Sequence, residues 1–177
     1  MTNLTLANLL DVVEPVNRKK CYQLLLDNME RFERAMGSSH NHQAWTGGYL
    51  DHVREVMHIG LTLYSALNSM RPLPFSMGDA SLVLFLHDLE KPWKDAESIW
   101  DFKTKAGRKK FRLDKLTEYD IQLTPEQHNA LEYVEGEGSD YSPKRRVMNE
   151  MAAFCHMCDV ASARIWFDEP NKGIKDV

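Results

Sequence analysis

The apolar run at residues 83–86 (Val-Leu-Phe-Leu) continues without a break into His87 and Asp88. Apolar sequence of this kind is buried in folded proteins, and a buried carboxylate is stable only when it is paired or bound to a metal ion. His52 stands in another apolar segment, and Asp159 stands in the last one. We therefore expect a fold that brings these four side chains to one metal centre.

Helical periodicity dominates the chain and strand-like alternation is nearly absent, so we expect an all-α fold. With 177 residues, the chain is expected to form a single domain over residues 1–177, with a core at about 18–168 and a mobile tail at 170–177. We expect five or six helices, the sixth being a short one inside an otherwise irregular insert at 91–116. The five predicted with defined bounds cover residues 17–36, 48–70, 77–90, 124–135 and 145–167.

The overall charge of the chain gives it no general attraction for polyanions. The formal net charge is −4, so we expect neither stable nucleic-acid binding nor attraction to an anionic membrane. No apolar run approaches the roughly 18 residues that a membrane span needs, and the N-terminus does not resemble a signal peptide. The three cysteines are an odd number in a chain large enough to form its own core, which favours a reducing compartment. The expected location is the cytoplasm.

The four candidate ligands form a mixed set of two imidazoles and two carboxylates, on three predicted helices. Such a set suits Mn²⁺, Fe²⁺, Co²⁺, Ni²⁺ or Zn²⁺, whereas an all-oxygen set would suit Mg²⁺ better. Mg²⁺ stays open as an alternative, and one ion is expected. Taken singly, each histidine could be an ordinary core residue, and Asp159 could simply pair with Arg164.

A second ion is the alternative to a single one. His128 and His156 both fall between the His-Asp pair and Asp159. His156 and Asp159 are three residues apart, so they share one face of a helix and could bind one ion together. Against this, His156 could be a core residue, and His128 lies in the polar start of its predicted helix.

The order His…His-Asp…Asp resembles that of the HD phosphohydrolase superfamily. The stretch from His42 to His52, His-Gln-Ala-Trp-Thr-Gly-Gly-Tyr-Leu-Asp-His, looks like the entry motif of HD domains related to 3′→5′ exoribonucleases. His-Asp-Leu-Glu-Lys at residues 87–91 looks like their His-Asp-x-Gly-Lys, with Glu90 in place of glycine. The resemblance covers residues 40–165 and implies a helical HD domain.

The resemblance also implies roles for individual residues. Asp88 is expected to bind metal and to help orient the attacking water, and Lys91 is expected to face the substrate phosphate. In size the chain is similar to the 5′-deoxynucleotidase and phage dATP triphosphohydrolase branch. That branch usually has glutamate where Lys91 stands and an Arg-Trp pair well before the first histidine. Here Trp45 lies only seven residues before His52 and no arginine stands directly before Trp45, so that branch's specificity is not carried over.

Substrate contacts are expected from two further places. His42 and Trp45 precede the first ligand helix and could stack on or hydrogen-bond a base. Lys144, Arg145 and Arg146 follow a proline at the start of a predicted helix, where basic side chains and free N–H groups could grip a phosphate. The alternative for these three is a solvated basic patch. The basic cluster at residues 103–112 is read as a surface face or as a lid.

Together these features predict a divalent-metal-dependent phosphohydrolase acting on nucleotides, in which a metal-activated water attacks the phosphate. The partner expected is a small nucleotide substrate, and a homo-oligomer is left open. Two alternatives remain. One is a di-iron oxygenase of the HD type, which needs His128 and His156 as ligands. The other is a non-catalytic HD module that senses a nucleotide.

Overall fold

The computed structural model describes residues 4–39, 42–94 and 101–166, and within these ranges the chain is helical without any strand. The expected all-α fold is therefore confirmed, while the predicted tail at 170–177 lies outside the described residues. The helices are α1 (Leu6–Leu10), α2 (Pro15–Asp27), α3 (Met29–Arg34), α4 (Gly48–Met70), α5 (Met77–Leu86), α6 (Lys105–Glu118), α7 (Pro125–Tyr133) and α8 (Glu150–Ile165), with short 3₁₀ helices η1 (Lys91–Trp93) and η2 (Gly138–Asp140).

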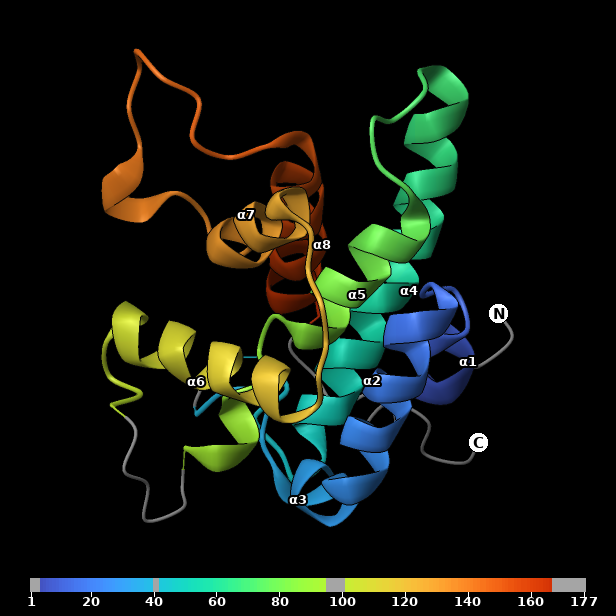
Figure 1. Ribbon diagram of the computed structural model, residues 1–177, viewed down its shortest axis with the longest axis vertical. Coiled ribbons are helices and arrows are strands. Elements are labelled where there is room, and N and C mark those ends of the chain that lie inside the picture. The colour runs from blue at the N-terminus through green and yellow to red at the C-terminus, as the bar shows by residue number, and fades with distance from the viewer. Residues whose placement is uncertain (1–3, 40–41, 95–100, 167–177) are drawn as a thin grey trace, which may run out of the picture.

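Helix α5 lies at the centre of the bundle and packs against α1, α4, α7 and α8 (Figure 1). Every residue from Ala80 to Leu86 is buried, as expected of a helix that is apolar on all sides. Helix α4 also packs against α8, while α7 covers another side of α8. The apolar run at 83–86 is therefore the core element, and its C-terminal end delivers His87 and Asp88 between α4 and α8.

The N-terminal part differs from the prediction, because the helix expected at 17–36 is divided into α2 and α3. The break is at Asn28, whose side-chain amide donates to the Leu24 carbonyl and to the Tyr119 hydroxyl, both at 2.9 Å. A side chain that bonds to the carbonyl four residues earlier competes with the helical backbone bond there. The unpredicted α1 is held by a capping box between Thr5 and Asn8.

Other boundaries also shifted. The helix expected at 77–90 ends at Leu86 and gives way to a turn before η1. The last helix begins at Glu150 instead of Arg145, because Asn149 caps it by accepting a hydrogen bond from the Ala152 N–H at 2.7 Å. In contrast, the predicted cap at Thr124 is present as a complete capping box. The insert at 91–116 carries a longer helix than expected, α6, with eight α-helices in total over the described ranges.

The helices of the described ranges are all unsuited to a membrane span. None of them combines enough length with enough apolar sequence to cross a bilayer.

Candidate metal centre

Helices α4 and α8 and the turn after α5 bring the four predicted ligands to one point, here called the candidate metal centre (His52, His87, Asp88 and Asp159). Their ligand atoms all lie within 4.8 Å of one another. His52 Nε2 lies 3.2 Å from each of His87 Nε2, Asp88 Oδ2 and Asp159 Oδ1. His87 Nε2 lies 3.2 Å from Asp88 Oδ2 and 3.7 Å from Asp159 Oδ1. The two imidazoles and Asp88 are buried, and Asp159 is half-buried.

The two glycines before His52 allow the loop to pack tightly against the start of α4. Gly47 has φ +82°, a conformation that favours glycine. A Cβ at Gly48 would lie 2.0 Å from the backbone oxygen of Gln43, so no larger residue fits there. The Gly-Gly pair therefore fixes where α4 begins, and with it the depth at which His52 enters the core.

The hydrogen bonds of the two imidazoles fix their tautomers. His87 Nδ1 lies 2.7 Å from the Leu84 carbonyl, which can only accept, so this nitrogen carries a proton. His52 Nδ1 lies 3.0 Å from Ser162 Oγ, whose own proton is donated to Glu55 Oε2 at 2.6 Å. Ser162 must therefore accept from His52. Both Nδ1 atoms are thus donors, so each Nε2 faces the candidate metal centre and can offer its lone pair to an ion once that nitrogen is deprotonated.

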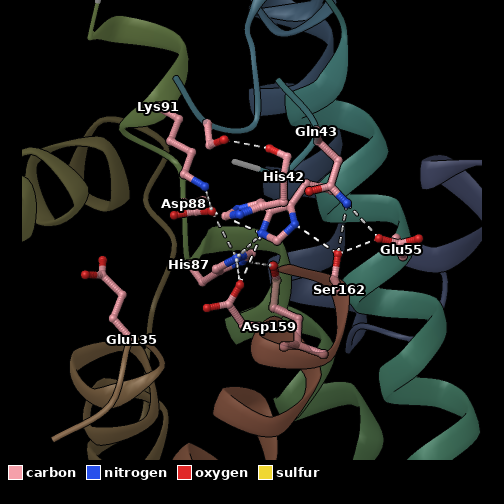
Figure 2. A network of polar contacts seen from close by, with 12 residues as sticks. His42, Gln43, Glu55, His87, Asp88, Lys91, Glu135, Asp159 and Ser162 are labelled. Carbon is pink, nitrogen blue, oxygen red and sulfur yellow. Dashed lines mark hydrogen bonds and ion pairs between the residues drawn. The ribbon is translucent and has the colours of Figure 1, made fainter. Parts of the chain in front are cut away.

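Ser162 belongs to a buried network that the sequence analysis missed. Gln43 Nε2 donates to Glu55 Oε2 at 2.8 Å and lies 3.3 Å from Ser162 Oγ. Figure 2 shows these three side chains together beside the candidate metal centre. Gln43 is buried and has a positive φ of 45°, which is uncommon outside glycine. Network members come from α4, α8 and the loop before α4. Ser162 lies three residues after Asp159, and Glu55 lies three residues after His52, so each shares a helix face with a predicted ligand. This spacing is the signal that could have found both residues.

Charges around the centre hold its carboxylates ionised. Burial alone would raise the pKa of Asp88, but Lys91 and His87 lower it well below its usual value. Burial likewise raises the pKa of Asp159, while hydrogen bonds from His52 and His87 outweigh it and lower the pKa. Burial lowers the pKa of His87, but Asp88 and Asp159 raise it to about 10 in the metal-free protein. The two ionised carboxylates attract positive charge strongly enough to keep a proton on His87. A metal cation could take the place of that proton.

The donor set of the candidate metal centre fits a divalent transition ion. Two imidazole nitrogens and two carboxylate oxygens are the mixed set that Mn²⁺, Fe²⁺, Co²⁺, Ni²⁺ or Zn²⁺ accepts. The outer hydrogen bonds of both imidazoles are those typical of metal-binding histidines. These residues could therefore hold one ion.

A cavity of about 240 Å³ adjoins the candidate metal centre. Two of the predicted ligands, Asp88 and Asp159, lie in its wall, and so do the predicted contact residues His42 and Lys91. Burial, and then the charge of Lys91, lower the pKa of His42 to about 4, so its imidazole is neutral at pH 7. The structure thus brings His42 and Lys91 into the wall of the cavity that adjoins the candidate metal centre.

The other predicted contact residues are not in the cavity wall. Trp45 Nε1 instead donates to Asp51 Oδ2 at 2.9 Å. Lys144, Arg145 and Arg146 are exposed in the loop before α8 and do not open a helix. Arg146 pairs with Glu150 at 3.1 Å, and both side chains are largely exposed, as expected of a solvated basic patch. Their predicted role depended on a helix start that Asn149 places five residues further on.

The two histidines predicted for a second ion do not join the candidate metal centre. His128 is exposed on α7. His156 shares α8 with Asp159 but turns its Nδ1 to the Val134 carbonyl at 2.7 Å. Among the described residues, neither histidine belongs to a group of side chains close enough to hold an ion. His156 and Asp159 share one face of α8. However, the His156 imidazole is bound to the end of α7 through the Val134 carbonyl, and it does not join the candidate metal centre.

Several charged residues of the site were not predicted as such. The cavity wall also contains Glu90, Lys94, Arg108 and Glu135. Behind them, Arg112 is buried and donates to the His87 carbonyl. Arg108 and Arg112 lie four residues apart in the 103–112 cluster, so they share one face of α6. This spacing, together with the nearby Phe111, could have marked the inward face of that helix.

Comparisons with protein-family models, with curated proteins and with solved structures gave no match for this chain.

Proposed function

We propose that the chain is a metal-dependent phosphohydrolase of the HD type, which hydrolyses a phosphate ester or anhydride of a nucleotide. The observation that carries this proposal is the convergence of two imidazoles and two carboxylates beside a cavity with basic side chains in its wall. The sequence order of the ligands and the His-Asp-Leu-Glu-Lys segment support the same reaction class. The HD resemblance thus supplies the reaction, and the geometry supports a metal site for it.

A bound divalent ion would supply a nucleophilic water and neutralise charge on the phosphoryl oxygens. The chain's own residues would do the rest. Lys91, already in the cavity wall, would neutralise a further phosphate oxygen. Asp88 would help to orient the attacking water. His42 is neutral at pH 7, so it would contact the substrate through hydrogen bonds and would not act as an imidazolium acid. Water would add to phosphorus, the bond to the leaving oxygen would break, and the water's proton would pass to solvent or the leaving group.

The two alternatives gain less support from the geometry. The di-iron oxygenase needs His128 and His156 as ligands, and neither is near enough to another ligand group in the described part of the chain. The nucleotide-sensing module needs binding without turnover, and the candidate metal centre has all four of its expected ligands in place.

The test is turnover by metal-depleted protein to which Mn²⁺, Fe²⁺, Co²⁺, Ni²⁺, Zn²⁺ or Mg²⁺ is added back singly. Nucleoside monophosphates and triphosphates are the substrates, and release of phosphate, pyrophosphate or triphosphate is measured. We expect metal-dependent turnover that Asp88→Asn abolishes. The matched control is Asp114→Asn, because Asp114 is exposed on α6 and pairs with Lys110, four residues before it on the same helix.

Three outcomes would count against the proposal. Binding of nucleotide without turnover at any metal would favour the sensing module. Two iron atoms per chain with a mixed-valent electron paramagnetic resonance signal would favour the oxygenase. Turnover that survives in Asp88→Asn would place the reaction elsewhere.

A further inference from the structure

Three basic side chains stand in the wall of the cavity, here called the basic wall (Lys91, Lys94 and Arg108). Lys91 and Lys94 come from η1 and the residue that follows it, and Arg108 comes from α6. Two chain segments thus converge on the cavity next to the candidate metal centre. The HD resemblance predicted that Lys91 faces the substrate phosphate, whereas the positions of Lys94 and Arg108 in the cavity wall come from the structure.

The buried Glu90 holds Lys94 and Arg108 in place without using their hydrogen-bond donors. Glu90 Oε1 lies 3.8 Å from Lys94 Nζ and 3.9 Å from Arg108 Nε. Both distances are too long for hydrogen bonds, so Glu90 orients the two cations without taking up their N–H groups. Arg108 donates elsewhere, through Nη1 to the Phe102 carbonyl at 3.5 Å and through Nη2 to Glu135 at 3.1 Å. Glu90 is 1% exposed, and its Oε2 has no hydrogen-bond partner. The two cations are therefore directed by a carboxylate beneath them.

Glu135 also lies in the cavity wall, next to Arg108. Its carboxylate lies 3.1 Å from Arg108 Nη2 and 3.6 Å from Arg112 Nη1. Figure 2 shows Glu135 and Glu55 on opposite sides of the site. Glu135 is 39% exposed at its side chain, so it can turn to solvent when an anion takes its place beside Arg108. We infer that a bound anion can displace the Glu135 carboxylate from Arg108.

A second cation is a poorer occupant of this space than an anion. Asp88, Glu90 and Glu135 do offer oxygen atoms close enough to hold an ion. However, Glu90 and Glu135 are already paired with three cations, Lys94, Arg108 and Arg112. A divalent cation among them would face like charges at short range. An anion would instead meet the cations of the basic wall, with the exposed Glu135 turning away from Arg108 to make room for it.

We propose that the basic wall binds the terminal phosphate of the substrate, so that the preferred substrate class is a phosphomonoester dianion. This inference rests on the proposed function and names the substrate class for the same site. The negative charge of the four carboxylates in the cavity wall is balanced by the three cations of the basic wall together with Arg112 behind it. The four carboxylates are Asp88, Glu90, Glu135 and Asp159. A divalent ion at the candidate metal centre would then leave an excess of two positive charges. A phosphomonoester carries close to two negative charges at neutral pH, and a phosphodiester carries one.

The size of the cavity agrees with this occupant. Its volume of about 240 Å³ is below the roughly 300–1,000 Å³ of pockets that enclose a whole drug-sized ligand. A cavity of this size would accommodate the phosphate end of a nucleotide and not the whole molecule.

The test is equilibrium binding of inorganic phosphate and of dimethyl phosphate, a diester monoanion, to the full chain at pH 8. Isothermal titration calorimetry on Mn²⁺-loaded and on metal-free protein gives the dissociation constants. Phosphate should bind more tightly than dimethyl phosphate. Lys94→Gln and Arg108→Gln should each weaken phosphate binding by about tenfold, since each removes a charged hydrogen-bond donor.

Two further variants separate a binding role from a structural one. Lys109→Gln removes the same charge from the next position of α6, where Lys109 pairs with Glu132 outside the cavity, and should leave phosphate binding unchanged. Glu135→Gln should strengthen phosphate binding, because it frees Arg108 from its anionic partner. Arg108→Lys should keep most of the binding, which would show that the loss in Arg108→Gln reflects charge and not misfolding.

The inference is overturned if Lys94→Gln and Arg108→Gln bind phosphate as the unaltered chain does, or if the unaltered chain does not bind it. It is also overturned if dimethyl phosphate binds equally well, or if a second Mn²⁺ binds and is lost in Glu135→Gln. The turnover assay is read separately. If phosphate binds with the expected affinities in all variants but no hydrolysis occurs, only the proposed function is refuted. If hydrolysis occurs but the variants do not show the expected affinities, only this inference is refuted.

Discussion

Lys91 Nζ lies 2.5 Å from Asp88 Oδ2, the oxygen that also faces both imidazoles of the candidate metal centre. The lysine and a metal ion would therefore compete for one carboxylate oxygen. Burial lowers the pKa of Lys91, but Asp88 outweighs it and raises the pKa above its usual value, so the side chain is a cation at neutral pH. Binding of an ion should release this ammonium towards the cavity, where a phosphate would lie.

Replacing Lys91 should therefore change metal affinity and turnover in opposite directions. In Lys91→Met the competing cation is gone, so we expect Mn²⁺ to bind about tenfold more tightly. Turnover should fall, because the phosphate loses a neutralising group. Titration calorimetry and the turnover assay measure the two quantities, with Lys109→Met as the control. Weaker Mn²⁺ binding in Lys91→Met would show that the lysine supports the metal site and does not compete with it.

Ser162 should control metal affinity without touching the ion. In Ser162→Ala, His52 Nδ1 loses the acceptor that fixes its tautomer, so its Nε2 no longer presents a lone pair reliably. Loss of such an outer partner typically costs tenfold to a hundredfold in metal affinity. We expect a drop of about that size in Mn²⁺ affinity by calorimetry. Ser69→Ala, at the exposed end of α4, serves as control, and equal affinities in both variants would refute the role.

Metal binding should release protons and strengthen as the pH rises. The pKa of His87 is about 10 in the metal-free protein because Asp88 and Asp159 outweigh the effect of burial. An ion must displace this proton from Nε2, so apparent affinity should rise about tenfold per pH unit below pH 10. Calorimetry of Mn²⁺ binding at pH 7.5, in two buffers of different ionisation enthalpy, should give about one proton released per ion. Affinity that does not vary between pH 6.5 and 8.5 would contradict this.

Arg112 should matter for stability more than for binding. Its guanidinium and the Glu90 carboxylate are both buried, 6% and 1% exposed, with Nη1 3.9 Å from Oε2. Arg112→Met would leave Glu90 less compensated in the core, so we expect the free energy of unfolding to fall by about 3 kcal/mol. Adding Glu90→Gln should recover part of it, since the uncompensated charge is removed. Urea unfolding of the single and double variants measures both effects, and strictly additive losses would argue against coupling of the pair.

The amino-acid sequence determined the helical class and the ligand set of this protein. Periodic apolar positions and the cap at Thr124 act over a few residues, so they can be seen in the chain itself. The four ligand residues stand out because carboxylates and imidazoles are unusual in apolar segments, and the structure brings all four together. The exceptions were local too. Asn28 and Asn149 moved helix ends by single hydrogen bonds that the apolar pattern does not reveal.

The tertiary structure alone decided what surrounds the ligands. Whether His156 or Ser162 reaches its neighbours depends on which face of α8 meets α4 and which meets α7. The inward position of Arg108 likewise depends on how α6 lies against the turn that contains Glu90. These contacts join residues far apart in the chain, and their geometry is set by the packing of whole helices. Local spacing shows which residues share a helix face, as for Ser162 and Arg108, but not which partner that face meets, because the partner is set only when the buried faces come together.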